Sequence, residues 1–244
     1  MTSRKKELRP FFGLYGGKWR DAPKYYPPPR HDTVIEPFAG SAGYSLRYFD
    51  RRVILCEIDE VIAGLWSYLI KVSPAEILRI PDMPAGGTVD DLRICQEARW
   101  LVGFWLNRGT VAPRRTPSAW MRQGIRPGCF WGDRVRQTVA SQVDAIRHWK
   151  VHQCSYQDCP YEGAATWFVD PPYKVAGRHY RYGSALLDYE ALASWCKSRN
   201  GQALVCENEG ADWLPFSPLK DVKTSRPGRR SIEVLWVSNG AGQG

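Results

Sequence analysis

Short apolar runs alternate with segments of helical periodicity at both ends of the chain. This alternation is typical of an α/β protein whose strands pair mainly in parallel. The predicted strands lie at residues 33–36, 53–56, 151–156, 164–169, 203–206 and 232–237, and the predicted helices at residues 44–49, 60–72, 90–106, 133–149 and 188–198. Residues 33–59 read as strand, glycine loop, helix, strand and acid, which is the start of a nucleotide-binding βαβ unit.

The pattern changes in the middle of the chain. Residues 107–130 are rich in Gly, Pro, Arg and Thr and lack a helical or strand period. An irregular stretch of this length in a compact domain is usually functional or disordered. We therefore expect residues 1–72 and 151–244 to form one domain that carries the chemistry, with residues 73–150 as an insertion.

Composition places the chain among globular proteins. It has 244 residues, 43% of them hydrophobic, which suffices for one α/β domain with an insertion or for two small domains. No apolar stretch approaches the ~18 residues of a membrane span, and the basic N-terminus lacks a signal peptide's apolar core, so we expect a cytoplasmic protein. The seven cysteines and four histidines lack metal-ligand spacing, and we expect reduced thiols and no metal.

The most informative motif follows the apolar run at residues 164–169. Asp170, Pro171, Pro172 and Tyr173 are expected where that strand's carboxyl end opens into a loop, which is where open α/β sheets bind ligands. The prolines restrict the backbone, so the carboxylate becomes a rigid acceptor, and the tyrosine adds a flat aromatic face. These groups suit a planar substrate that bears an NH2 group. A strand that only ends in a tight Pro-Pro turn is the alternative.

A second motif, at residues 36–43, joins the first predicted strand to a helix. Its glycines allow the backbone to approach a ligand closely, or only allow tight packing of strand against helix. Glu57, after the second predicted strand, is placed to accept both hydroxyls of a ribose. Glu36 is placed to approach the charged end of the same ligand, while Asp59 either contacts its adenine edge or caps the following helix.

Aromatic residues, glycines and a lysine gather near the N-terminus, at Tyr15, Gly16, Gly17 and Lys18. Such a segment is able to form a clamp over a nucleoside. The alternative is a basic loop whose aromatic side chains pack in the core.

In combination, these motifs resemble the Dam-like (D12 class) S-adenosylmethionine-dependent N6-adenine DNA methyltransferases. The similarity spans most of the chain and rests on the order of residues 15–20, 36–43, 57–59, 104–108 and 170–173. It implies an α/β, Rossmann-like methyltransferase fold with a mixed, mainly parallel sheet. It also implies that the insertion at residues 73–150 is a mostly helical target-recognition region.

The resemblance further implies that S-adenosylmethionine is the cofactor and that Lys18 and a neighbouring aromatic, Tyr15, lie beside it. Glu57 would hold the ribose. Two positions depart from the family pattern, because Leu14 stands where an aromatic residue is frequent and Glu57 stands where Asp is frequent. The residues expected at the cofactor are Tyr15, Gly16, Gly17, Lys18, Glu36, Pro37, Phe38, Ala39, Gly40, Ser41, Gly43, Glu57, Ile58, Asp59 and Asp170.

The catalytic residues expected are Asp170, Pro171, Pro172 and Tyr173. Asp170 and the Pro171 carbonyl would accept the two hydrogens of the adenine N6 amine, so that the nitrogen lone pair points at the methyl group. Tyr173 would stack on the base, which has to be flipped out of the duplex at a cost of roughly a few kcal/mol.

Arginines dominate the irregular insertion, and the chain carries a formal net charge of +9. A surplus of Lys and Arg favours a polyanionic partner, here double-stranded DNA, although a solvated basic loop is the alternative. The expected DNA contacts are Asn107, Arg108, Arg114, Arg115, Arg122 and Arg126 in the insertion, and Lys174, Arg178 and Arg181 after the tetrapeptide. Trp120 and Gln123 are further candidates for reading base edges, and Arg226, Arg229 and Arg230 form a third basic patch.

Three alternatives stay open. N4-cytosine methylation uses the same amine geometry, although Asp rather than Ser before Pro-Pro-Tyr favours adenine. N6-adenine methylation of RNA is the second, because the basic loops alone do not distinguish RNA from DNA. A non-catalytic relative would bind the cofactor and nucleic acid without turnover. The sequence does not distinguish a monomer from a weak dimer. With the small size and the lack of a nuclease-like region, the family resemblance implies a solitary enzyme from a phage or prophage.

Overall fold

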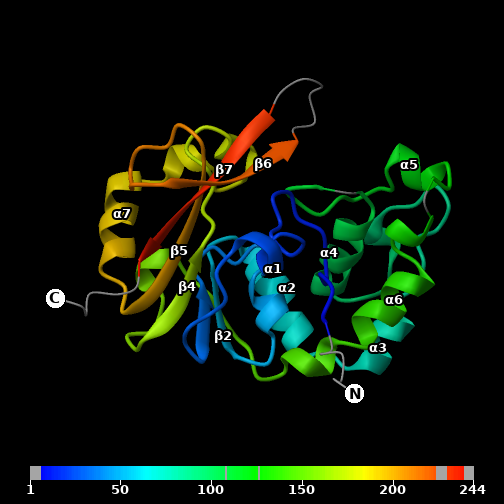
Figure 1. The fold of residues 1–244 in the computed structure, drawn as a ribbon. Helices are drawn as coiled ribbons and strands as arrows, with labels where there is room; N and C mark the ends of the chain where they lie inside the picture. Colours follow the sequence, from blue (N-terminus) through cyan, green and yellow to red (C-terminus); the bar gives the residue numbers. More distant parts are fainter. Residues whose placement is uncertain (1–6, 108, 126, 224–229, 239–244) are drawn as a thin grey trace, which may run out of the picture.

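A computed structural model describes residues 7–107, 109–125, 127–223 and 230–238 (Figure 1). Across these ranges, seven strands form one sheet in the order β3-β2-β1-β4-β5-β7-β6. They are β1 (Thr33–Glu36), β2 (Arg52–Glu57), β3 (Lys150–Gln153), β4 (Ala165–Val169), β5 (Gly201–Asn208), β6 (Ser217–Lys223) and β7 (Arg230–Ser238). Strands β1 to β5 pair in parallel, and β7 is antiparallel to β5 and β6. The prediction of a Rossmann-like α/β fold with a mixed, mainly parallel sheet is confirmed.

The strand order reverses between β1 and β4. The chain continues from β1 to β2 and β3 on one side of this point, and from β4 to β5 on the other. Loops that leave such neighbouring strands diverge, which opens a crevice at the carboxyl ends of the strands. The residues that follow Glu36, Glu57 and Val169 therefore meet at one edge of the sheet.

Side chains of the parallel strands alternate between two hydrophobic cores, one on each face of the sheet. Val34, for example, faces the larger core and its neighbour Ile35 the smaller one. This alternation follows from the two-residue period of a strand, and burial on both faces explains why the strands read as continuous apolar runs. Helix α2 (Glu60–Lys71) contributes to the larger core and α7 (Tyr189–Lys197) to the smaller.

The remaining helices lie mostly on the α2 side of the sheet (Figure 1). They are α1 (Ala22–Tyr25), α3 (Pro74–Arg79), α4 (Gln96–Trp105), α5 (Ala119–Arg122) and α6 (Asp133–Ala140). Helices α3 to α6 belong to the segment between α2 and β3, where α4 packs on α2 and α3 packs on α6. One hydrophobic core runs from the sheet through α2, α3, α4 and α6. None of the helices in the described ranges has both the length and the apolar character needed to cross a membrane.

Two predicted helices are shorter in the structure. The helix expected at residues 133–149 ends at Ala140 and is followed by a 3-10 turn, Val143–Ile146. Val143, Ile146 and Trp149 are all buried, and their spacing of three suits a 3-10 turn better than an α-helix. The helix expected at residues 90–106 begins only at Gln96, because Thr88 and Asp91 cap a separate 3-10 turn before it.

Two further predicted elements differ. The predicted helix at residues 44–49 is a 3-10 turn, Ser45–Tyr48, and the strand expected to reach residue 156 ends at Gln153. Ser155 then caps the turn Tyr156–Asp158, with its side chain accepting from Gln157 N–H.

Strand β6 has no counterpart among the predicted strands. Pro218, Lys220 and Asp221 interrupt its apolar pattern. It lies at the edge of the sheet, where a strand pairs on one side only and tolerates proline and charge. Helices α1, α3 and α5 were also not predicted, because segments of four to six residues are too short to show a helical period.

Candidate active site

Three sequence motifs meet at the carboxyl edge of the sheet, as predicted. The glycine loop, residues 37–43, follows β1; Glu57 ends β2; and Asp170 follows β4. Because β1 lies between β2 and β4, the loop has Glu57 on one side and Asp170 on the other. The N-terminal segment with Lys18 packs against the same loop.

The glycine loop is held by both flanking elements. Gly40 N–H donates to Glu57 Oε2 at 2.9 Å, and Trp66 Nε1 donates to the Gly40 carbonyl at 2.8 Å. Gly40 has φ +46, a conformation that glycine adopts without strain. A Cβ on Gly43 would lie 2.6 Å from Trp19 N and 2.8 Å from Lys18 N, so only glycine lets this backbone come so close. Close packing, the alternative reading of the loop, is therefore one of its roles, and it positions Lys18.

Glu57 is buried, and both of its carboxylate oxygens accept a backbone N–H. Gly40 donates to Oε2, and Asp59 N–H donates to Oε1 at 3.0 Å. Burial raises the pKa of the Glu57 carboxyl, while these hydrogen bonds oppose the shift. Asp59 caps α2 by accepting from Val61 N–H at 2.9 Å, which confirms the capping interpretation of that residue. Ile58 between them is 44% exposed and presents an apolar surface.

Glu36, the last residue of β1, is deeply buried. It is 2% exposed, and its Oε1 accepts from Ser45 N–H at 2.7 Å. Burial raises the pKa of Glu36 to about 8, with Asp170 adding to the rise and Lys18 opposing it. The charges of Asp170 and Lys18 therefore both affect the pKa of Glu36.

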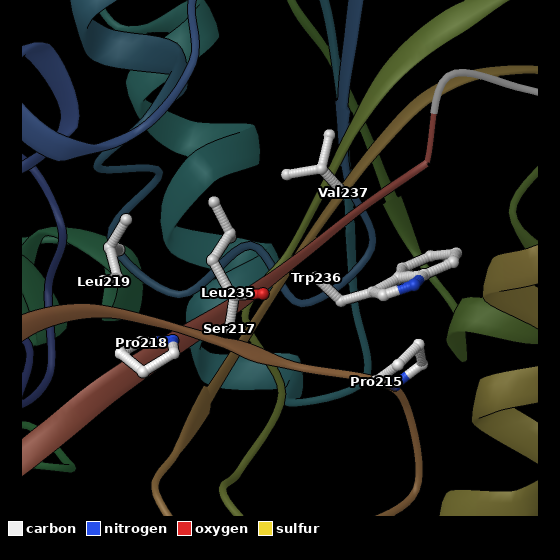
Figure 2. A pocket seen from close by; sticks show the side chains of 7 residues that line it. All are labelled: Pro215, Ser217, Pro218, Leu219, Leu235, Trp236 and Val237. Carbon is white, nitrogen blue, oxygen red and sulfur yellow. The ribbon is translucent and has the colours of Figure 1, made fainter.

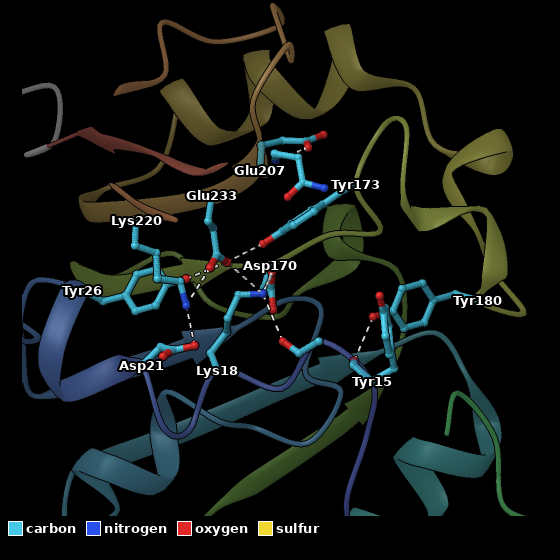
Figure 3. A network of polar contacts seen from close by, with 12 residues as sticks. Tyr15, Lys18, Asp21, Tyr26, Asp170, Tyr173, Tyr180, Glu207, Lys220 and Glu233 are labelled. Carbon is cyan, nitrogen blue, oxygen red and sulfur yellow. Dashed lines mark hydrogen bonds and ion pairs between the residues drawn. The ribbon is translucent and has the colours of Figure 1, made fainter. Parts of the chain in front are cut away.

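Lys18 joins the N-terminal segment to the tetrapeptide (Figure 3). It is only 7% exposed. Its ammonium lies 2.9 Å from Asp170 Oδ1 and 3.2 Å from Glu233 Oε1, and it donates to the Gly16 carbonyl at 3.1 Å. Burial works against the charged form, but the two carboxylates prevail and raise the pKa of Lys18 above its ordinary value.

Asp170 is half-buried, with 21% of its side-chain surface accessible. Burial raises its pKa; Lys18 opposes this rise and Glu233 adds to it. Only Oδ1 is in contact with Lys18. Because a carboxylate offers about four acceptor sites, Asp170 keeps acceptor capacity for another partner beside Lys18.

Tyr173 places its hydroxyl inward and its ring beside Lys18. The hydroxyl donates to Glu233 Oε1 at 2.7 Å, and the Lys18 ammonium lies 5.0 Å from the ring centroid. Pro171 is buried, and the Pro172 carbonyl accepts from Tyr189 OH at 2.5 Å. Within the described ranges, no residue donates to the Pro171 carbonyl. One acceptor of the tetrapeptide is therefore used by the fold, and another stays available.

Glu233 is the main site residue that sequence reasoning missed. It lies on β7, 4% exposed, and contacts Lys18, Tyr26, Tyr173 and Lys220. Lys220 on β6 also pairs with Asp21. The available signal was a single acid inside the apolar run at residues 232–237, which a central strand does not bury without partners.

The loop after the tetrapeptide folds back over the site. Glu207 at the end of β5 accepts Lys174 N–H at 2.8 Å. Tyr180 OH donates to the Tyr15 carbonyl at 2.9 Å, so the loop reaches the N-terminal segment. Arg181 lies 2.6 Å from Glu60 at the start of α2. Tyr15, expected at the cofactor, is 56% exposed here.

The predicted DNA-contacting residues stay at the surface, although several are internally paired. Arg115 pairs with Asp90, and Lys174 lies 2.8 Å from Asp212. Arg122 donates to the Pro117 carbonyl at 2.6 Å. The exposed members of the set are Arg114, Arg115, Arg122, Lys174, Arg178 and Arg181, with Asn107 half-buried. Arg108, Arg126, Arg226 and Arg229 lie outside the described residues, as does the side chain of Arg230.

The cysteines and a pocket on the β6–β7 hairpin are two further features of the described structure. All seven cysteines are free thiols, and no group of three or more His, Cys, Asp or Glu in the described ranges is arranged to hold a metal ion. A pocket of about 360 Å³ lies on the β6–β7 hairpin (Figure 2). Its lining, which includes none of the predicted site residues, is Pro215, Ser217, Pro218, Leu219, Leu235, Trp236 and Val237.

Known proteins resemble this chain in solved structures only, and at low sequence identity. No protein-family model and no curated protein matches this chain. Two solved structures of the rRNA methyltransferase aviRa from Streptomyces viridochromogenes are similar at 17% and 16% identity, over 83% and 85% of this chain and 75% and 78% of that chain, with TM-scores of 0.37. A conserved hypothetical protein from Streptococcus pyogenes is similar at 14% identity, over 83% of this chain and 84% of that chain, with a TM-score of 0.34. Likenesses at this level do not bear on activity or substrate, which the site itself has to support.

Proposed function

We propose that the chain transfers the methyl group of S-adenosylmethionine to N6 of a flipped-out adenine in double-stranded DNA. The observation that carries this proposal is the position of Asp170, half-buried beside Lys18 and Tyr173 at the point where the strand order reverses. The glycine loop and Glu57 lie on the adjacent strands. A donor site and an acceptor site are thereby neighbours at the same edge of the sheet.

The residues around β1 and β2 fit the proposed cofactor. Glu57 is an acceptor-only carboxylate whose oxygens each accept one N–H, which leaves lone pairs for the two ribose hydroxyls. Ile58 offers an exposed apolar face to an adenine ring. Glu36 and Asp170 are acceptors for the amino group at the other end of the ligand. When bound, S-adenosylmethionine would supply an electrophilic methyl group on a sulfonium.

The tetrapeptide fits an exocyclic amine. Such a nitrogen is a poor nucleophile, because its lone pair is delocalised into the ring. Asp170 and the Pro171 carbonyl are two acceptors for its two hydrogens, and a charged acceptor forms the stronger hydrogen bond. The raised pKa of Asp170 also favours its taking the proton that the amine loses. Lys18 covers one face of the Tyr173 ring, so the base would stack on the other.

Exposed arginines support a nucleic-acid substrate. Arg114, Arg122 and Arg178 are at the surface, and Trp120 on α5 is 56% exposed beside Arg122. Guanidinium groups bind phosphates, and side chains of this loop are able to reach base edges. A target amine inside the base stack requires flipping, for which the acceptors and the aromatic ring of the tetrapeptide form the receiving site.

The test is expression of the chain in bacteria that lack their own DNA methylation. Modified bases are then mapped by single-molecule sequencing, and nucleosides from DNA and RNA are quantified by mass spectrometry. We expect N6-methyladenine in DNA at a defined sequence. N4-methylcytosine in DNA, or methylated RNA without methylated DNA, would replace the proposed substrate.

Asp170→Ala separates catalysis from binding. We expect methyl transfer to fall at least about 10³-fold, since removal of one transition-state contact costs 10²–10³ and this change removes the anionic acceptor itself. Cofactor affinity, measured by calorimetry, should fall much less, by about tenfold, because Asp170 is one acceptor of the cofactor and Glu36 and Glu57 remain. Glu162→Ala, which removes an exposed acid just before the other end of β4, is the matched control. Undiminished transfer by Asp170→Ala would refute the mechanism.

A further inference from the structure

Glu233 lies at the centre of the polar network beside the tetrapeptide (Figure 3). Its carboxylate contacts both Lys18 and Tyr173. We propose that Glu233 is a positioning residue: it holds Lys18 and Tyr173 in place against Asp170, so that the Asp170 carboxylate keeps acceptor capacity for the substrate amine. This inference rests on the proposed function for its catalytic consequence, but the positioning itself does not depend on turnover.

Four hydrogen-bond donors contact the Glu233 carboxylate. Glu233 Oε1 accepts from Tyr173 OH at 2.7 Å and from Tyr26 OH at 2.8 Å, and lies 3.2 Å from the Lys18 ammonium. Oε2 lies 2.9 Å from the Lys220 ammonium. All four partners are donors, so the position requires a group that only accepts. A glutamine would turn its NH2 group toward one of them.

Positive and negative side chains alternate along the network around Glu233. Each anion in the network lies next to a cation, in the order Asp21, Lys220, Glu233, Lys18, Asp170. Buried charges are tolerated only when paired in this way. Two lysines and two tyrosines lower the pKa of Glu233 to about 2 against the opposing effect of burial, so it is ionised throughout the working range.

Glu233 also affects how strongly Lys18 binds Asp170. The Lys18 ammonium is shared between two carboxylates. If Glu233 were neutral, Lys18 would be drawn to Asp170 alone, and the carboxylate would lose acceptor strength toward the amine. Tyr173 would lose the hydrogen bond that fixes the plane of its ring. Both effects act on the reaction through other groups, and Glu233 need not touch the substrate.

The experiment compares Glu233→Gln with the wild-type protein in two assays. The first is competitive acylation of lysines with acetic anhydride, read by mass spectrometry between pH 7 and 10, with Lys71 on α2 as internal reference. Only the neutral amine reacts. Loss of the Glu233 charge should lower the pKa of Lys18 and raise its labelling about tenfold or more, since one pKa unit is a factor of ten in the neutral fraction. Thermal unfolding shows whether the variant is folded during labelling.

The second assay is methyl transfer. We expect kcat to fall about 10–100-fold in Glu233→Gln, as for loss of a charged hydrogen bond, with KM for the cofactor within about threefold. The acid limb of the pH–rate profile should move to lower pH, because Glu233 is one of the groups that raise the pKa of Asp170. The other titratable groups that face Asp170 are Lys18, Tyr26, Glu36, Tyr173, Tyr180, Cys206 and Glu207.

A pair of tyrosine variants keeps the inference testable if Glu233→Gln does not fold. Tyr173→Phe and Tyr26→Phe each remove one hydrogen bond to the same oxygen of Glu233. Tyr26 packs on Phe168, whereas Tyr173 belongs to the tetrapeptide. We expect Tyr173→Phe to lower kcat about tenfold and Tyr26→Phe to change it less than threefold.

The outcomes separate the two proposals. If the wild-type protein methylates no nucleic acid, the proposed function fails, and Lys18 labelling still decides the positioning role. Unchanged Lys18 labelling in folded Glu233→Gln overturns the inference. So does an active Glu233→Gln with an unshifted acid limb, or an equal effect of the two tyrosine changes.

Discussion

The charges at the carboxyl edge of the sheet and the charges of the insertion are built in opposite ways. Lys18 and Glu233 are buried, Asp170 is half-buried, and the Lys18 ammonium pairs with both carboxylates. Arg114 and Arg122 are exposed, and Arg114 makes no ion pair within the described residues. A buried charge is costly unless it is paired, whereas an exposed one is solvated and screened by salt. The first arrangement fixes geometry, and the second leaves charge available to a mobile polyanion.

The largest expected effect on stability comes from Lys18→Met. The change leaves the buried Glu233 and the half-buried Asp170 carboxylates with less compensation, which we expect to lower the free energy of unfolding by about 3–5 kcal/mol. Without Lys18 the pKa of Asp170 rises further, so protonation relieves the repulsion and the loss should be greater at pH 8 than at pH 5.5.

Urea unfolding at the two pH values measures the effect of Lys18→Met. Lys174→Met is the matched control, because Lys174 also pairs with an acid but both partners are exposed. Its effect should stay below about 1 kcal/mol. Equal losses in the two variants would erase the distinction between buried and exposed pairs.

Glu36 should make stability fall as pH rises. Its pKa is about 8 in the folded protein against 4.5 ordinarily, so the folded state holds an extra proton between these values. The stabilisation is complete below pH 4.5 and is lost as pH rises toward 8, by on the order of 3 kcal/mol between pH 5 and 8. Glu36→Gln should flatten this dependence and be the more stable protein at pH 8. A thermal-unfolding series that falls equally steeply in both proteins would contradict the assignment.

Glu57→Gln should weaken cofactor binding. A glutamine keeps one acceptor oxygen in place of two, and loss of a charged hydrogen bond corresponds to about 10–100-fold in affinity. Isothermal titration with S-adenosylmethionine measures this. Glu60→Gln, three residues on at the exposed start of α2, is the control and should change affinity less than about threefold. Equal affinities for wild type and Glu57→Gln would remove Glu57 from the cofactor site.

The arginine changes should have the smallest effect at fixed salt and the clearest salt signature. If Arg114 and Arg122 each contact one phosphate, each alanine variant should lower the slope of log K against log salt by about 0.9. Fluorescence anisotropy on a DNA duplex between 50 and 200 mM salt measures the slope. Arg79→Ala on α3, also exposed, should leave it unchanged. Equal slopes in all three variants would place DNA elsewhere on the molecule.

Much of the scaffold and half of the candidate site could be predicted from the sequence. Apolar runs mark strands that are buried on both faces, and the residue after such a run lies at the carboxyl edge, which located Glu57 and Asp170. The boundaries of helices and strands were less predictable, because Thr88 and Ser155 cap local turns that override the apolar period. Strand β6 was missed because an edge strand need not be apolar.

Tertiary structure alone decided the electrostatic partners. Tyr26 and Glu233 are 207 residues apart in the chain and 2.8 Å apart in the fold. A lone acid in β7 has no local period, and its meaning depends on which segments the strand order brings beside it. Local pattern determines which residues are buried and where strands end, because these follow from the neighbours of each residue. Which buried charges meet follows from the path of the whole chain, and here it joins Lys18, Asp170 and Glu233 into one network.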